Sequence, residues 1–405
     1  MKKIFYSLFM AVASVAFISC SSNDPEPDPN PTPGPGEDDP IEIPADAINS
    51  FYVLNRGSNT KDSQVDGTLS YYTYSPSEGK LLSTALTAFK DVNDYSLGNN
   101  PNAMAVYDKY LWVVINESNR IEVIDMETKK SVKQISFSEE KYGSPRQIWI
   151  DEDKAYITFV SDNTENSAAG GYIAQYNCKT YEMIQYFPVG SKANKPDGIV
   201  VVGEYVYCAD NYGIKIEDGF EDGNLVVRWL KNSDWTSANN GLEQIIIKGG
   251  LTPTDIVTNG TEVFVICSGV DASNTRKKNS TVYKITGYEG NAFCEGTLMK
   301  VDKKYLYVIN APKNAVTPIT YKRYSVIDNN DVTNMLAEGE GVDYPTSLAI
   351  DEWTGDIIIG SATKVGGYVS ETTNGYFNLY SSDGKKLLKG ETGIDPFDIL
   401  FRPVK

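Results

Sequence analysis

The sequence PFDILF at residues 396–401 begins a β-strand pattern only a few residues before the chain ends at Lys405. The pattern is a Pro, two variable residues and then an apolar run of strand-forming residues. The same pattern begins at Pro101, Pro145, Pro196, Pro253 and Pro345, and without the Pro at Glu295. Successive starts are separated by 42 to 57 residues. A repeat of strand-like units at this period is typical of the blades of a β-propeller.

Each repeat continues with a second apolar strand that ends in a small polar residue. Residues 111–116, LWVVIN, and residues 305–310, YLYVIN, are two examples. A third strand of alternating polarity and a weaker fourth strand follow, as in residues 120–136. Four strands per repeat match the composition of a propeller blade, so the sequence predicts an all-β fold.

The two ends of the repeat array have complementary defects. Residues 51–55, FYVLN, match a second strand, and residues 67–76 and 79–84 match a third and a fourth, but no first strand precedes them. Residues 396–401 are a first strand with nothing after it. We therefore predict a seven-bladed β-propeller over residues 46–405, closed by the last strand, which leaves no open sheet edge. An open solenoid is the alternative, but it does not explain why one end lacks the strand that the other has spare.

The first 19 residues have the pattern of a secretory signal peptide. Lys2 and Lys3 precede an apolar run at residues 4–18 that is too short to span a bilayer. The run ends in FISC, which resembles a bacterial lipobox with Phe17 in place of the usual Leu. We predict lipidation of Cys20 and attachment to the membrane through that anchor. An ordinary signal peptide that happens to contain a Cys is the alternative.

Residues 20–45 are rich in Pro and in acidic side chains. Every second residue from Pro25 to Pro35 is Pro, which favours an extended polyproline II conformation over a packed core. We expect this segment to be a stalk between the anchor and the propeller.

Composition excludes several classes of function. The formal net charge of −17 disfavours partners that bind through phosphates, so we expect no nucleic-acid partner. The chain has no His, which removes Ser-His-Asp and Cys-His catalysis and His-ligated metals. The spacing of Cys178, Cys208, Cys267 and Cys294 matches no zinc or iron–sulfur motif. Two interpretations of these four residues are left: they are buried free thiols, or two of them form a single disulfide. We predict no catalytic residue and no metal site.

A ligand site is expected on one face of the ring. In a propeller the first strands line the central channel, and the loops before each first strand and after each second strand share one face. Loops on a rigid scaffold are common binding surfaces. The alternative is that polar residues at strand ends only satisfy backbone groups. The candidate ligand-binding residues are Asn55, Arg56, Asn116, Asn119, Arg146, Asp162, Asp210, Asn211, Tyr212, Asn310 and Asp398.

The combination of signal peptide, Cys20, Pro-rich stalk and repeated units resembles the YncE-like propeller lipoproteins of Bacteroidetes. Residues 51–58, FYVLNRGS, followed by GTLSYY resemble the opening blade of that group, and the resemblance covers roughly residues 48–405. Asp24, Glu26 and Asp28 resemble the export signal that sends such lipoproteins to the cell surface. The resemblance implies a lipid-anchored protein exposed on the outer membrane.

Within that group, the BtuG-like lipoproteins are acidic seven-bladed propellers that capture cobalamin and pass it to a TonB-dependent transporter. The resemblance thus implies cobalamin or another corrinoid as a transported ligand, with no catalytic cofactor. Two other hypotheses remain. One is a surface propeller that binds glycans or proteins, and the other is a lactonase-type or lyase-type propeller enzyme, which would need converging carboxylates at the channel.

Overall fold

The computed structural model describes residues 44, 46–60, 63–137, 143–160, 171–188, 196–210, 215–216, 219–220, 223–235, 241–271, 275–312, 317–327 and 331–402. The chain separates into two compact units, Met1–Glu42 and Ile43–Lys405. The predicted signal peptide, Cys20 and nearly all of the predicted stalk lie outside the described residues. The account below concerns the second unit.

The described residues of this unit form β-sheets and no helix, as the sequence predicts. Within them, no helix is long and apolar enough to cross a membrane. Five sheets have four antiparallel strands each. They are β34 (Pro396–Phe401), β1 (Asn49–Asn55), β4 (Thr68–Ser75) and β5 (Lys80–Ala85); β6 (Pro101–Tyr107), β7 (Tyr110–Ile115), β8 (Arg120–Asp125) and β9 (Ser131–Ser136); β10 (Ser144–Asp151), β11 (Lys154–Val160), β12 (Tyr172–Asn177) and β13 (Met183–Pro188); β24 (Leu298–Val301), β25 (Tyr305–Asn310), β26 (Thr320–Ser325) and β27 (Val332–Asn334); and β28 (Pro345–Ile350), β29 (Ile357–Ser361), β32 (Tyr376–Tyr380) and β33 (Lys386–Glu391).

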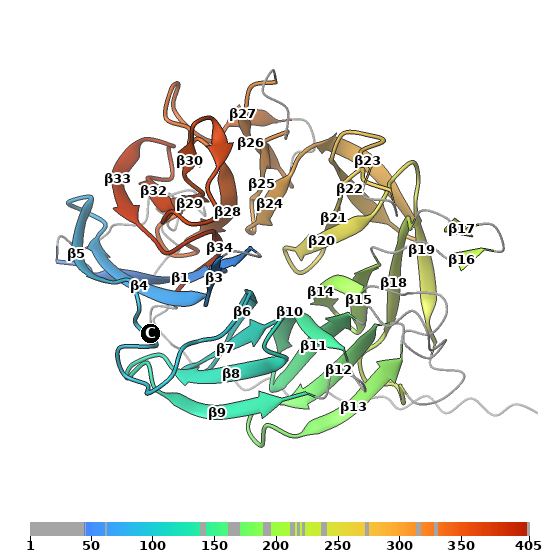
Figure 1. Ribbon diagram of the computed structural model, residues 1–405. Helices are drawn as coiled ribbons and strands as arrows, with labels where there is room; N and C mark the ends of the chain where they lie inside the picture. The colour runs from blue at the N-terminus through green and yellow to red at the C-terminus, as the bar shows by residue number, and fades with distance from the viewer. Residues whose placement is uncertain are drawn as a thin grey trace, which may run out of the picture. The chain divides into compact units, whose positions relative to one another are not determined.

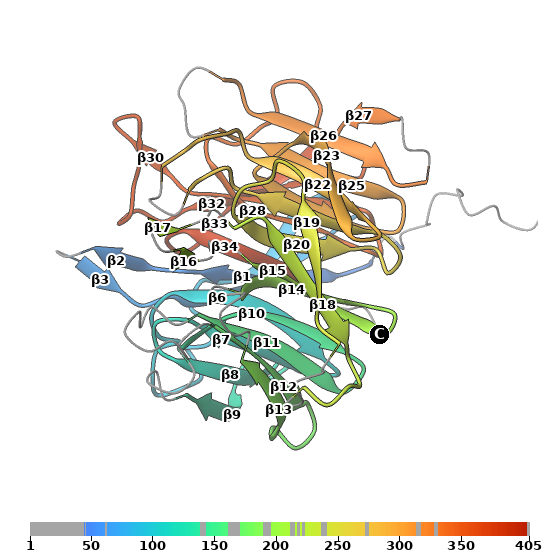
Figure 2. The same ribbon diagram turned by 90° about the vertical axis from the view of Figure 1, so that its right-hand side faces the viewer.

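A sixth sheet has eight strands, because two sets of four join through a short parallel pairing of β19 with β23. The sets are β14 (Pro196–Val202), β15 (Tyr205–Asp210), β18 (Leu225–Leu230) and β19 (Glu243–Ile247), and β20 (Pro253–Thr258), β21 (Val263–Cys267), β22 (Thr281–Thr286) and β23 (Glu289–Glu295). Three short hairpins stand outside these sheets: β2 (Ser58–Thr60) with β3 (Ser63–Val65), β16 (Lys215–Ile216) with β17 (Gly219–Phe220), and β30 (Lys364–Val365) with β31 (Tyr368–Val369). Figure 2 shows β2, β3 and β30 projecting from the same side of the ring.

The sheets are arranged as the blades of a β-propeller, with their first strands around the centre (Figure 1). Going around the ring, β34, β6, β10, β14, β20, β24 and β28 each contact the next, and β28 contacts β34. The approach is close enough that a Cβ on Gly198 of β14 would lie 2.7 Å from the backbone N of Ile256 in β20. A side chain at Gly198 would therefore push two innermost strands apart.

The predicted closure by the last strand is confirmed. β34 pairs antiparallel with β1, with Phe401 opposite Phe51 and Asp398 opposite Leu54. The backbone N–H of Arg402 donates to the carbonyl of Ser50 at 2.9 Å, which extends the pairing. One sheet thus contains both ends of the ring, and its inner edge is covered by neighbouring first strands.

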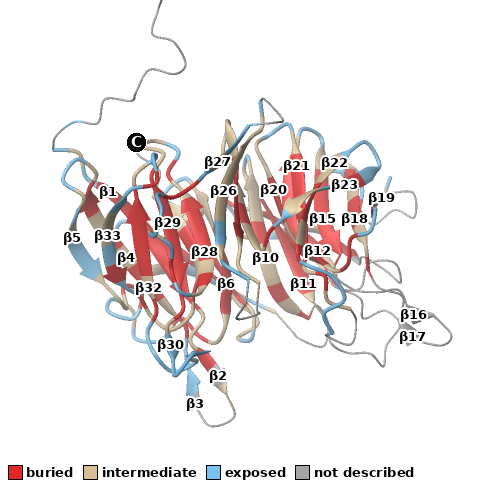
Figure 3. Cartoon of the chain, turned by 90° about the horizontal axis from the view of Figure 1, so that it is seen from above, coloured by how far each residue is buried: buried red, intermediate tan, exposed pale blue. Residues whose placement is uncertain are grey.

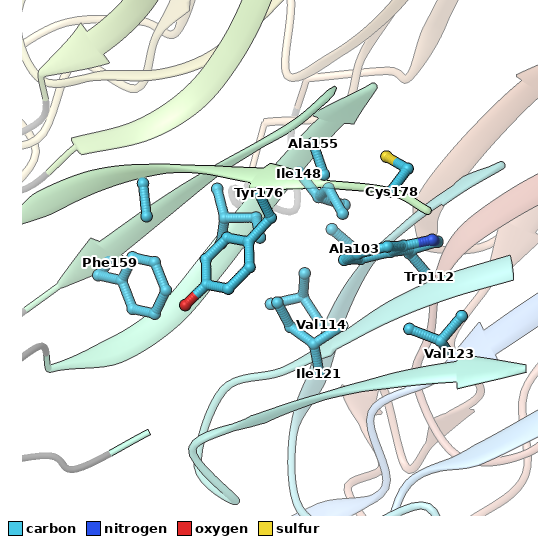
Figure 4. Packing of buried hydrophobic residues seen from close by; sticks show 12 residues of the cluster. Ala103, Trp112, Val114, Ile121, Val123, Ile148, Ala155, Phe159, Tyr176 and Cys178 are labelled. Atoms are coloured by element: carbon cyan, nitrogen blue, oxygen red, sulfur yellow. The ribbon is translucent and has the colours of Figure 1, made fainter. Parts of the chain in front are cut away.

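Hydrophobic residues pack between neighbouring sheets. The fully buried Trp112 of β7 belongs to one cluster with Ala155 of β11 and Tyr176 of β12 (Figure 4). Burial of each such side chain contributes about 1.5–3 kcal/mol. Figure 3 shows the result: buried residues dominate the inner strands, whereas the outer strand β5 is largely exposed. Cys178, Cys208, Cys267 and Cys294 are free thiols, the first three buried, so the free-thiol alternative is confirmed.

Candidate ligand-binding site

A cavity of about 620 Å³, here called the mouth, opens on one face of the ring. Its walls come from loops that follow second strands, at Ser58 and Ser268, and from loops that precede first strands, at Asn100, Tyr344 and Asp395. The prediction that these two kinds of loop share one face is therefore confirmed.

A second cavity of about 420 Å³ continues from the mouth into the centre of the ring, and we call it the channel. The two cavities share several lining residues, among them Arg56, Thr254 and Phe397. The channel wall includes the variable positions of the repeat, together with apolar residues that follow them along the first strands. Those variable positions are Asn102, Ala103, Arg146, Gln147, Asp197, Gly198, Thr254, Asp255, Thr297, Thr346, Ser347, Phe397 and Asp398.

A β-bulge explains why both variable positions line the channel. The register of the first strand shifts after its Pro, for example between Pro145 and Ile148 and between Pro196 and Ile199. A bulge bends a strand and changes the direction of its side chains. The strict alternation of the strand is interrupted there, so two consecutive side chains line the same cavity.

Arg56 lies at the junction of the mouth and the channel. Its Cζ atom is 3.0 Å from the centroid of the Phe397 ring, and its Nη2 donates to Oδ1 of Asn102 at 2.8 Å. Its Nη1 is 4.0 Å from Oδ2 of Asp395, too far for a hydrogen bond. Its Nε is buried without a partner among the described residues. Burial lowers the pKa of Arg56 to about 10, with Asp395 acting in the opposite direction.

Arg146, by contrast, is fully engaged. Its Nε and Nη2 donate to the two carboxylate oxygens of the buried Asp197 at 2.8 Å and 3.2 Å. The carbonyl of Arg146 accepts a hydrogen bond from Nδ2 of Asn102 at 2.7 Å. The bidentate pair fixes the guanidinium of Arg146 in the channel wall.

Two further carboxyl groups lie deeper in the channel. Burial raises the pKa of Asp255 to about 6 and raises the pKa of Asp398, and the charge of Lys300 opposes both shifts. Asp398 accepts hydrogen bonds from the backbone N–H groups of Met104 and Ile399 at 2.9 Å and 3.0 Å. Lys300 also lines a third cavity, of about 750 Å³, at the opposite end of the ring.

Three predicted site residues line the mouth or the channel: Arg56, Arg146 and Asp398. A fourth, Asn310, lines a small cavity of about 130 Å³ beside Arg276. Its Nδ2 donates to Oε2 of Glu295 at 3.4 Å.

Four predicted residues lie outside the linings of these cavities and support the fold. Asn55 is fully buried and donates to Oγ1 of Thr68 and Oγ of Ser70 at 3.1 Å and 3.0 Å. Asn116 donates from Nδ2 to the carbonyl of Pro145 at 2.9 Å, which connects two blades. Asn119 has a positive φ of 48° in the turn after β7, and Asp210 is buried at the end of β15. For Asn116, and for the contact of Asn55 Nδ2 with the carbonyl of Thr68 at 3.3 Å, the alternative of satisfying backbone groups describes the observed contacts. Asp162, Asn211 and Tyr212 lie outside the described residues.

The sequence analysis missed Asp395, Phe397, Tyr344, Asp255 and Lys300. Two features of the repeat could have identified most of these residues: the position directly before the Pro and the two variable positions after it. Asp395 and Tyr344 directly precede the Pro of a repeat, and Phe397 and Asp255 occupy its variable positions. Those positions change polarity from blade to blade, whereas the flanking apolar positions do not. Among the described residues, no group of three or more His, Cys, Asp or Glu side chains could hold a metal ion.

Comparison with known proteins supports the fold at the level of architecture. No protein-family model matches the sequence, and no curated protein matches it. Among solved structures, a protein from Bacteroides uniformis that is provisionally assigned as a 6-phosphogluconolactonase has a TM-score of 0.57 at 12% identity, covering 88% of this chain and 99% of that one.

Two other solved structures are similar over comparable lengths. A hypothetical selenium-binding protein from Sulfolobus tokodaii has a TM-score of 0.57 at 11% identity, covering 87% of this chain and 93% of that one. The β-propeller domain of the Trilobed protease from Pyrococcus furiosus has a TM-score of 0.50 at 11% identity, covering 88% and 96%. Identities this low establish the propeller fold and nothing about ligand or activity.

Proposed function

We propose, from the β-propeller fold that the chain shares with these structures, that it is a cell-surface binding lipoprotein of the YncE-like group. Its ligand would be cobalamin or another corrinoid, held in the mouth and passed to a TonB-dependent transporter in the outer membrane. The proposal assigns binding and not catalysis to the chain, and it includes seven blades. The blade count takes the eight-stranded sheet as two blades, each with its own first strand, β14 and β20.

The observation that carries the proposal is the continuity of the mouth with the channel. Cavities of about 300–1,000 Å³ with a few convergent polar groups are the usual size for small-molecule sites. The mouth, of about 620 Å³, combines aromatic side chains such as Tyr344 with small polar ones such as Thr254 and Thr346. A large ligand fringed with amides suits such a wall, because hydroxyl and amide groups both donate and accept hydrogen bonds.

β1 joins the two ends of the ring. It begins at Asn49, whose Nδ2 donates to Oδ2 of Asp351 in the lining of the opposite cavity, and it ends at Asn55, one residue before Arg56 of the mouth.

Calorimetry with the full-length chain in detergent tests the ligand. We expect heat of binding with cobalamin or cobinamide at micromolar concentration, with little dependence on salt because a near-neutral ligand gains little from an acidic protein. The double variant Tyr344→Ala, Thr346→Ala should weaken binding at least tenfold. The matched control Lys133→Ala, on the exposed strand β9, should not.

Absence of heat, and of any change in melting temperature with either corrinoid, would overturn the ligand assignment. Binding of a surface glycan under the same conditions would then identify the chain as a glycan-binding propeller. Turnover of a lactone would identify it as an enzyme.

A further inference from the structure

The ion pair between Arg56 and Asp395 is open in this structure, although both residues line the mouth. The Nη1 of Arg56 and the Oδ2 of Asp395 are 4.0 Å apart, whereas Nε of Arg146 and Oδ1 of Asp197 are 2.8 Å apart. Among the described residues, the Asp395 carboxylate accepts no hydrogen bond and Nη1 of Arg56 donates none. A donor and an acceptor thus stand side by side in the mouth as a long ion pair, and neither makes a hydrogen bond among the described residues.

The surrounding contacts hold Arg56 in this position. Phe397 lies against the face of its guanidinium, and Asn102 accepts from Nη2. Asn102 is itself held by the carbonyl of Arg146, whose side chain is tied to Asp197. These contacts leave the Nη1 edge of the planar group available, and a fixed planar edge favours a planar partner.

The backbone holds Asp395 beside Arg56. The N–H of Arg56 donates to the carbonyl of Asp395 at 3.0 Å, and that of Gly57 donates to the carbonyl of Ile394 at 3.2 Å. Asp395 has a positive φ of 53°, a conformation that Asp and Asn tolerate better than most residues. Burial raises the pKa of its carboxyl group, and the nearby Arg56 opposes that rise. Both charges are therefore partly desolvated and incompletely neutralised.

We propose that Arg56 and Asp395 together bind a primary carboxamide of the ligand, whose oxygen accepts from Nη1 of Arg56 and whose N–H donates to Oδ2 of Asp395. The O and N atoms of an amide are about 2.3 Å apart, given C=O and C–N bonds of about 1.23 and 1.33 Å. A protein donor and acceptor 4.0 Å apart can meet both atoms with nearly straight hydrogen bonds of about 2.9 Å. In the closed pair of Arg146 and Asp197, by contrast, Nε, Nη2 and both carboxylate oxygens already bond to each other.

The alternatives to an amide are less favourable on electrostatic or geometric grounds. A carboxylate would meet Asp395, and an ammonium group would meet Arg56, each at the cost of like-charge repulsion. A vicinal diol can donate and accept, but its oxygens are staggered and do not share the plane that Phe397 imposes on the guanidinium. The inference rests on the proposed function for the identity of the whole ligand, but the amide preference itself can be measured with simple probes.

The test uses the full-length chain with ¹⁵N-labelled Arg in detergent, titrated with acetamide, acetate, methylammonium and ethylene glycol. The Nε–H resonance that is missing in Arg56→Lys identifies Arg56. We expect acetamide to shift this resonance with at least tenfold tighter apparent affinity than the other three probes. Equal or tighter binding of acetate, or of ethylene glycol, would overturn the proposal.

Two variants sharpen the test. Asp395→Asn, a residue that also tolerates the positive φ, should make acetate bind more tightly than acetamide. Arg56→Gln should make methylammonium bind more tightly than acetamide, and its binding can be followed through the backbone amides of the mouth. Arg276→Gln, which removes a different mouth cation, should leave the preference unchanged. An unchanged acetamide preference in Asp395→Asn, with the melting temperature retained, would also overturn the proposal.

The larger ligand separates this inference from the proposed function. Cobalamin should bind at least tenfold more tightly than a derivative in which the contacting amide is hydrolysed to a carboxylate, and Asp395→Asn should remove that difference. Amide preference without cobalamin binding would overturn the corrinoid assignment alone. Cobalamin binding without any amide preference would overturn only the role of Arg56 and Asp395.

Discussion

Tyr74 in β4 donates from its hydroxyl to Oδ2 of Asp356 at 2.9 Å, although the two residues belong to the sheets at opposite ends of the repeat array. Both side chains are buried. The Tyr74 hydroxyl also accepts from Nδ2 of Asn49 at 3.1 Å. This buried contact exists only because the ring closes and brings the first and last sheets together.

Tyr74→Phe should destabilise the propeller by about 1–3 kcal/mol, because it leaves the Asp356 carboxylate buried without this donor. Burial already raises the pKa of Asp356, and the Tyr74 hydrogen bond opposes that rise. The loss should therefore be larger at pH 7, where the carboxylate is charged, than at pH 4. Chemical denaturation at the two pH values measures it. Tyr368→Phe, at a residue that is 81% exposed, is the matched control and should have no effect.

Deletion of residues 396–405 should abolish cooperative unfolding of the whole body, because β34 is the innermost strand of the sheet that closes the ring. A circular permutant is the control. Arg402 already lies beside Ser50, so a short linker from residue 402 to residue 49 would place β34 ahead of β1 and keep every pairing. The permutant should melt cooperatively. A truncated chain with a near-native melting transition would disprove the closure.

Asp255→Asn should stabilise the protein at pH 7 and not at pH 4. The pKa of Asp255 is raised from 3.8 to about 6 in the folded state, so ionisation disfavours folding. The contribution of this group to stability therefore falls as pH rises from about 4 to about 6. We expect a gain of up to about 3 kcal/mol at pH 7, because the raised pKa already includes the opposing charge of Lys300. Melting curves across this pH range should show the effect, and the exposed Asp94→Asn should not reproduce it.

Asn55→Ala should lower stability by about 1–3 kcal/mol and leave ligand affinity unchanged. Its side chain is fully buried, bonds to Thr68 and Ser70, and lines neither the mouth nor the channel. The conservative Asn55→Asp, which keeps the size but removes the donor, should be similarly destabilised. Melting and calorimetry together separate the two effects, and weaker binding at full stability would return Asn55 to the ligand site.

If Cys20 carries the proposed lipid anchor, Cys20→Ala should release the protein from the membrane fraction without changing ligand affinity, because the Pro-rich sequence of residues 20–45 predicts an extended spacer before the propeller. Fractionation of cells that express either form measures the release. A membrane-bound pool that is unchanged in the variant would disprove lipidation at Cys20.

The repeat carried most of the information about the fold. The Pro-initiated units predict the four strands of each sheet, and the missing first strand at residue 51 together with the spare one at residue 396 predict the closure. This was possible because the strand pattern is local: alternation, apolar runs and turn residues are written into consecutive positions. The same local logic predicted that the loops before first strands and after second strands share one face of the ring.

The sequence could not separate binding residues from structural ones at the strand ends. Asn55 and Asn116 have the same sequence signature as a ligand contact, but their side chains are used to satisfy neighbouring strands. Whether such a side chain is available to a ligand depends on how close it lies to polar groups of neighbouring strands and blades. Those distances are a property of the closed ring.

By itself, the sequence determined the strand order and the ring closure, because each follows from a pattern along the chain. Only the tertiary structure decided that Arg56 and Asp395, which lie near opposite ends of the propeller sequence, face each other across 4.0 Å in the mouth. The pairing of β1 with β34 brings them together, and the backbone hydrogen bond from Arg56 to the carbonyl of Asp395 holds them side by side. No spacing rule in the chain specifies that distance, because it results from the packing of the whole ring.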